Sequence, residues 1–202
     1  MSSAPNSRGK VPVEQMLEPL AQFYRAAGHA LPEVAELSPD DVPQPYHGLL
    51  VHQSDMTSTL EKFFHQRVHL DVLQTREEDG VLYREVILVG DNDGHPTEFG
   101  AIRIHLDRFA DEARRLILEG HLPLGRVLAD EAVEYRCCPQ RFFCWEGDAL
   151  TSRVFSLDGP HRLYGRHNIL ERPNGDPLAE AVEILPRIEA VQGRTPPSVF
   201  PE

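Results

Sequence analysis

A series of strand-like runs joined by tight-turn sequences constrains the fold more than any other feature of this chain. Apolar and polar residues alternate along the first run, 67–72, which is the pattern of a half-buried strand. Asp79-Gly80 and Asp93-Gly94 are hairpin signals that separate this run from the next two. Five more runs follow it, at 81–89, 97–106, 133–145, 162–171 and 178–185. Because strands joined by hairpins are antiparallel, the sequence predicts an antiparallel sheet.

Helical patterns lie between and before these runs. Asp55 is a candidate N-cap for a helix over 55–66, and Asp107 for a second helix that Gly120 ends. An earlier helical pattern over 16–27 is limited or kinked by Pro19. Helices that cover one side of an antiparallel sheet make an α+β domain.

Length, charge and cysteine content restrict the class of protein. We expect one domain over 13–186, a disordered arm at 1–12 and a C-terminal tail at 187–202, because 202 residues suit a single decorated domain. The formal net charge of −12 argues against nucleic acid and anionic membranes as partners. The cysteines (137, 138 and 144) form no disulfide framework, and no apolar run is long enough to span a membrane. We expect a cytoplasmic monomer or weak dimer.

Generic motifs indicate no chemistry. The common signatures of serine hydrolases, zinc proteases, nucleotide-binding loops and zinc deaminases are absent. Ten histidines raise the question of a metal, but their spacings fit solvated or core histidines better, so we predict no metal and no cofactor. We predict that Cys137 and Cys138 are buried in a strand and have no chemical role. We also predict that the aromatic cluster Phe142, Phe143 and Trp145 belongs to the hydrophobic core.

An ordered series of short segments carries more information. From Leu49 to Pro186, about two thirds of the chain, their order and spacing resemble the chorismate–pyruvate lyase family. The segments are LLVHQSDMT (49–57), YREVIL (83–88), PLGRVL (123–128), LYGR (163–166), NGDPL (174–178) and EILP (183–186). The resemblance implies a six-stranded antiparallel sheet with flanking helices that enclose a ligand cavity. It also implies cofactor-free elimination of pyruvate from chorismate to leave 4-hydroxybenzoate.

The composition suits a substrate of that kind. Of the 20 basic residues, only Lys10 and Lys62 are lysines. Guanidinium groups bind carboxylates bidentately, and chorismate is a dianion with two carboxylates. A carboxyl group in an apolar cavity has a raised pKa and can donate a proton to the departing enolpyruvyl oxygen.

Three residues match the family's binding positions, and a glycine beside one of them completes the predicted binding site. Arg84 matches a carboxylate-binding arginine, and strand alternation places it on the same face as the apolar Leu82 and Val86. Met56 matches a position whose backbone amide contacts the same carboxylate. Leu124 matches a position that lines the cavity through its backbone, and Gly125 permits the close approach.

Two positions depart from the family. A second arginine and an acidic residue are replaced by Ala101 and Val182. Arg103 and Glu180 each lie two residues from those positions, and a shift of two keeps the face of a strand. We therefore predict that Arg103 holds the second carboxylate and Glu180 donates the proton, with unrelated exposed side chains as the alternative. Glu183 faces the other side and is a weaker substitute.

Two functions follow from this pattern. One is a chorismate lyase-like enzyme that acts on chorismate or a close analogue. The other is a non-catalytic module that binds or senses a small aromatic or cyclohexadienyl carboxylate with the same fold.

Overall fold

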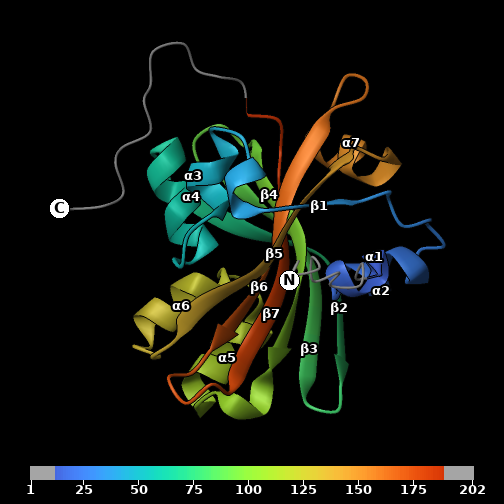
Figure 1. Ribbon diagram of the computed structural model, residues 1–202. Coiled ribbons are helices and arrows are strands. Elements are labelled where there is room, and N and C mark those ends of the chain that lie inside the picture. The colour runs from blue at the N-terminus through green and yellow to red at the C-terminus, as the bar shows by residue number, and fades with distance from the viewer. Residues whose placement is uncertain (1–11, 189–202) are drawn as a thin grey trace, which may run out of the picture.

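The protein, a computed structural model, is described over residues 12–188, and Figure 1 shows its course. Its centre is a seven-stranded antiparallel sheet in the order β1-β5-β6-β7-β4-β3-β2. The strands are β1 (Ala35–Leu37), β2 (Val68–Glu78), β3 (Val81–Gly90), β4 (Pro96–His105), β5 (Arg136–Glu146), β6 (Arg162–Glu171) and β7 (Pro177–Leu185). The helices are α1 (Val13–Met16), α2 (Leu20–Ala26), α3 (Tyr46–Leu50), α4 (Met56–Phe64), α5 (Asp111–Glu119), α6 (Leu124–Asp130) and α7 (Ala149–Phe155).

The predicted α+β fold with an antiparallel sheet is confirmed, with one strand more than expected. All six predicted runs form strands, and 162–171 has the predicted bounds. The extra strand, β1, lies in the proline-rich segment 28–46, which the sequence presents as irregular. It has only three residues and owes its conformation to pairing with β5, so no alternation could reveal it.

The helices partly follow the capping signals. The side chain of Asp55 accepts a hydrogen bond from the Ser58 N–H and starts α4. The second helix, α5, begins at Asp111 rather than at Asp107, because residues 106–108 form a 3₁₀ turn. Gly120 ends it with a φ of 70°, the left-handed conformation expected of this cap. No described helix is long and apolar enough to cross a membrane. The predicted arm and tail lie almost entirely outside the described residues.

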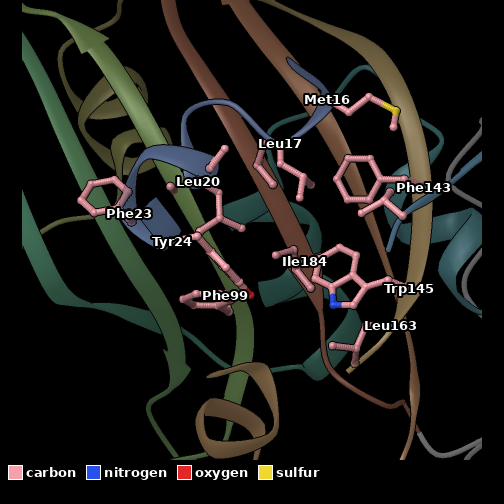
Figure 2. Packing of buried hydrophobic residues seen from close by; sticks show 14 of the residues in the cluster. Met16, Leu17, Leu20, Phe23, Tyr24, Phe99, Phe143, Trp145, Leu163 and Ile184 are labelled. Carbon is pink, nitrogen blue, oxygen red and sulfur yellow. The ribbon is translucent and has the colours of Figure 1, made fainter. Parts of the chain in front are cut away.

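The helices cover the two faces of the sheet unequally. Figure 1 shows α3, α4, α5 and α6 on one face, and α1, α2 and α7 on the other. We call the first the cavity face and the second the helix-pair face, after α1 and α2. Figure 2 shows the core of the helix-pair face, where Leu17 and Leu20 meet Phe143, Trp145 and Ile184. The aromatic cluster predicted as core is indeed buried here and beside α3.

The sheet is divided into two halves that meet at β4 and β7. Strands β2, β3 and β4 follow one another, as do β5, β6 and β7, and the β4–β7 pairing is the junction between them. We call this junction the seam. At the seam Gly100 pairs with Glu183, and an added Cβ on Gly100 would lie 2.0 Å from the Val182 carbonyl oxygen. A side chain at position 100 would require the two strands to move apart. No side chain therefore covers the sheet at this point.

Candidate functional site

A small cavity lies on the cavity face, between the sheet and helices α4, α5 and α6. Its volume is about 80 Å³, measured as the space open to the centre of a water molecule. One water needs about 10–15 Å³ on this measure, so the cavity suits a small organic molecule. Most of its wall is aliphatic, including Leu70, Val86, Leu88, Ile102, Ile104, Ile117, Leu122 and Leu170.

Arg84 supplies the cavity's cation. Strand β3 alternates, so Arg84 points to the same face as Val86 and is only 5% exposed. Its Nη2 donates to the Ile117 carbonyl at the end of α5, and Gly120 packs against the guanidinium. Within residues 12–188, no carboxylate forms an ion pair with it. Burial lowers the pKa of Arg84. An arginine side chain nevertheless keeps its charge in proteins.

The first turn of α4 lies at the rim of the same cavity. Asp55, Met56 and Thr57 all line it, and the Asp55 carboxylate caps the helix by accepting the Ser58 N–H. The N–H groups at the first positions of a helix have no partner within the helix and favour an anion. Gly125 allows α6 to approach, since an added Cβ would lie 2.8 Å from Asp55 Oδ1 and 3.0 Å from Thr57 Oγ1. Leu124 begins α6 and lines the opposite wall.

The structure thus brings together the four residues predicted to bind the ligand, Arg84, Met56, Leu124 and Gly125. They come from three separate parts of the chain. Their shared wall is the geometry that the sequence interpretation required, while their roles in binding remain a proposal.

Arg103 and Glu180 lie elsewhere. Strands β4 and β7 are antiparallel neighbours, and Arg103 pairs directly with Glu180 in the register. The two side chains form an ion pair, and Glu180 also lies 2.7 Å from Nε2 of His167. Because they point to the helix-pair face, the sheet separates them from Arg84, and neither lines the cavity. The predicted catalytic roles of Arg103 and Glu180 on a substrate held by Arg84 therefore lack geometric support.

The family's two replaced positions face the same way. Ala101 and Val182 pair across the seam, and their side chains are buried in the core beneath α1 and α2. An arginine or a glutamate there would have to displace apolar packing on the helix-pair face.

The sequence interpretation overlooked a buried charged network on the cavity face. Arg166, of the LYGR segment, is fully buried, and its Nε donates to Glu183. Its Nη1 and Nη2 donate to the carbonyl oxygens of Leu50, His52 and Ser54. Every nitrogen of this guanidinium has a protein acceptor. Arg166 thus fixes the segment before α4, and with it the position of the Met56 N–H.

Glu98 lies beside that network and lines the cavity. It is 5% exposed, and its Oε2 has no protein partner among the described residues. Burial, and then the neighbouring Glu183, raise the pKa of Glu98 well above its ordinary value. A carboxyl group in this setting is neutral and can donate a hydrogen bond. Glu98 shares its strand face with Gly100 and Ile102, which is the one signal that could have revealed it.

Asn168 lies across the cavity from Arg84. The strand register aligns Arg84 with Ile102, then Ala181, then Asn168, so all four lie in one row across the sheet. Asn168 is fully buried, and neither Nδ2 nor Oδ1 has a protein hydrogen-bond partner over residues 12–188. The sequence held no sign of this, because one asparagine in a strand is unremarkable.

Comparisons with known proteins give a fold and no family. No family model matches the chain, and no curated protein matches it. Among solved structures, PhnF from Mycobacterium smegmatis superposes with a TM-score of 0.52 at 10% identity, covering 67% of this chain. This chain spans 65% of the length of PhnF.

The region shared with PhnF is its effector domain. The structure of that domain alone gives a TM-score of 0.52 at 9% identity and covers 66% of this chain and 88% of the domain. A gene product of Staphylococcus aureus gives 0.50 at 10% identity and covers 67% of this chain and 90% of its own. At these identities the likeness shows the fold alone. None of these three structures is named as a chorismate lyase.

Proposed function

We propose that this domain binds a small aromatic monocarboxylate in the cavity as a non-catalytic binding module. The observation that carries the proposal is Arg84, a buried guanidinium in an aliphatic wall with no described carboxylate paired to it. Leaving a charge buried without a partner costs several kcal/mol, so such a group is retained where a ligand supplies the partner. The free N–H groups of the first turn of α4 add to the attraction for an anion.

The charges around the cavity favour one carboxylate over two. Arg166 neutralises Glu183, and burial raises the pKa of Glu98, which favours its neutral form. Arg84 is then the only cation on the described wall that is free to pair with a ligand. Chorismate carries two carboxylates, and the second would meet Glu98 and Glu183 rather than an arginine. A hydroxybenzoate, with one carboxylate and one ring, fits this balance better.

The comparison with PhnF supports a binding module. Its structure is named as an effector domain and shares this fold over 88% of its own length, which fits a module that carries no chemistry of its own. Fold similarity at this level gives no ligand, so the cavity has to provide the chemical argument.

A lyase is the second candidate, and one observation favours it. Glu98 is a buried carboxyl with a raised pKa in the same cavity as Arg84, which is the setting of a general acid. In that case Glu98 takes the role that the sequence assigned to Glu180.

Calorimetry with matched ligands tests the proposal. We expect benzoate and 4-hydroxybenzoate to bind, and benzamide, which has the same shape without the charge, to bind at least roughly 30-fold more weakly. Equal affinity for benzoate and benzamide, or no binding of either acid, would overturn it.

Incubation with chorismate separates the two candidates. A binding module releases no pyruvate, while a lyase produces pyruvate and a hydroxybenzoate in equal amounts. If pyruvate appears, Glu98→Gln should reduce its rate by roughly 10²–10⁴, and Glu180→Gln should leave it unchanged.

A further inference from the structure

We infer that Asn168 is a specificity-determining residue, which binds a neutral group able to donate and accept hydrogen bonds at the end of the ligand opposite the carboxylate. A hydroxyl or a carboxamide is such a group. This inference rests on the proposed function and adds the chemistry of the ligand's second end.

The first argument is the state of the Asn168 side chain. It is fully buried, it lines the cavity, and neither of its polar atoms has a protein partner with full hydrogen-bond geometry in the described chain, although the Cys137 thiol lies close to it. Buried amides in folded proteins are almost always hydrogen-bonded, since an unmet donor or acceptor is costly. In the free protein, water can form hydrogen bonds with both atoms. A ligand group that is both an acceptor and a donor can replace that water.

The second argument is position. Arg84 and Asn168 occupy the two ends of one row across the sheet, with only Ile102 and Ala181 between them. Three strand spacings of about 4.8 Å put their Cα atoms about 14 Å apart. The long arginine side chain covers part of that distance, and what remains suits one six-membered ring with a substituent at each end. The small side chain of Ala181 leaves the floor of this row open.

The third argument is charge. An amide selects a neutral partner, whereas a second carboxylate would be bound by a cation. Next to Asn168 the wall offers the thiol of Cys137, and burial raises the pKa of that thiol to about 11, so it is neutral too. Arg166 is close in sequence but has all its nitrogens engaged with Glu183 and with carbonyl oxygens. Apart from the Arg166–Glu183 ion pair, which is already satisfied, the polar groups next to Asn168 are therefore neutral.

The test compares ligand pairs on matched variants. The probes are benzoate, 3- and 4-hydroxybenzoate, and 4-carbamoylbenzoate, each titrated by calorimetry into the wild-type protein, Asn168→Leu and Asn168→Asp. Leu163→Met, a conservative change in the core of the helix-pair face and away from the cavity, is the control. We expect at least one polar-substituted acid to bind the wild-type protein and Leu163→Met roughly 10-fold more tightly than benzoate. In Asn168→Leu that ratio should fall to about 1, with benzoate itself bound at least as well.

The outcomes separate the inference from the function on which it rests. If benzoate binds and the ratio is the same in the wild-type protein and Asn168→Leu, the inference is wrong and the proposed function stands. If no acid binds the wild-type protein, both are wrong. Thermal melting without ligand gives a second readout: a residue kept for ligand recognition can be replaced without loss, so the melting temperature of Asn168→Leu should be unchanged or higher. A clear decrease would show that Asn168 serves the fold instead.

Discussion

The two faces of the sheet each hold a conspicuous arginine, and the arginines differ in what surrounds them. Arg103, on the helix-pair face, is about a third exposed and is paired with Glu180. Arg84, on the cavity face, is buried and bonded only to a carbonyl oxygen among the described residues. The charge of an arginine that is paired and close to solvent is already compensated. The charge of a buried arginine without a carboxylate partner is compensated only when an anionic ligand binds.

A third arginine makes the comparison sharper. Arg166 is as buried as Arg84 and shares its face, but Glu183 and three carbonyl oxygens satisfy it. Burial alone therefore does not mark a binding residue. The mark is burial on the cavity wall together with a missing protein partner, and it applies to Arg84, which has no described carboxylate partner, and to Glu98 and Asn168.

The largest effect is expected from breaking the satisfied buried pair. Arg166→Met leaves Glu183 buried beside Glu98 without a cation and frees the segment before α4. Removing one partner of a buried pair costs about 3–5 kcal/mol, so the free energy of unfolding in urea should fall by that amount. The double variant Arg166→Met with Glu183→Leu removes the stranded charge and should recover part of the loss. A single variant as stable as the wild type would show that the network does not support the fold.

Arg84→Ala should separate binding from stability. We expect 4-hydroxybenzoate to bind about 2–4 kcal/mol more weakly, the range for removing one partner of a desolvated charge pair. The folded state loses no ion pair, so the free energy of unfolding should fall far less than in Arg166→Met. Calorimetry and urea denaturation on the same samples measure both quantities. Unchanged affinity in a folded variant would remove Arg84 from the site.

The pH dependence of stability tests the support that Arg166 gives to α4. The His52 ring accepts the Ser54 N–H through Nδ1 and bonds the Leu49 carbonyl through Nε2. Burial, and then Arg166, lower the pKa of His52 to about 4. The unfolded chain binds this proton near pH 6.5 and the folded protein does not, so stability falls as the pH decreases from 6.5 to 4.

His52→Gln should remove that contribution. A shift of about 2.5 units from the ordinary 6.5 corresponds to about 3 kcal/mol at most, less because His52 is only partly buried. Urea denaturation of both proteins at pH 7 and pH 4 should show the wild type losing more stability than the variant over this interval. Equal losses would mean that His52 titrates normally in the folded protein.

The smallest effect is expected on the helix-pair face. Arg103→Met and Glu180→Gln each remove a part-exposed ion pair, which contributes about 0–1 kcal/mol. Neither residue lines the cavity, so the affinity for 4-hydroxybenzoate should not change. A tenfold loss of affinity in either variant would mean that the two faces are coupled and that the contrast between Arg84 and Arg103 is too simple.

The sequence revealed the sheet far better than the site. Strand runs such as 162–171 can be predicted because apolar and polar residues alternate along them and turn residues bound them. Both signals are local in the sequence. The short helices α3, α6 and α7 were missed, because five to seven residues packed against a sheet carry little periodicity of their own. The strand β1 depends on its partner β5 and has no local signal at all.

Only part of the candidate site could be predicted from the sequence, for a related reason. Arg84 was identified through the resemblance of its segment to the lyase family, and the alternation of its own strand, which places it among apolar neighbours on one face, supported that assignment. Glu98 and Asn168 could not be identified, because an unmet hydrogen bond is a property of the surroundings rather than of a sequence pattern. Arg103 and Glu180 pair across neighbouring strands in the structure, yet their positions in the sequence did not show which face they occupy relative to Arg84. The face depends on the register between β3 and β4, because successive residues of a strand alternate between the two faces. Arg84 aligns with Ile102, so Arg103, one residue further along, lies on the opposite face.

The seam between β4 and β7 has a consequence for how the protein folds. Most strand pairs join segments close in the chain, such as β2 with β3, whereas Gly100 and Glu183 come together from distant parts of it. Non-local pairings of this kind pay the larger loop-closure entropy and tend to form late. Arg84 belongs to one half of the sheet and Asn168 to the other, so a half-assembled chain has no complete site. A ligand that needs both ends can bind only the fully assembled molecule, and it therefore shifts the population toward that state in proportion to its occupancy.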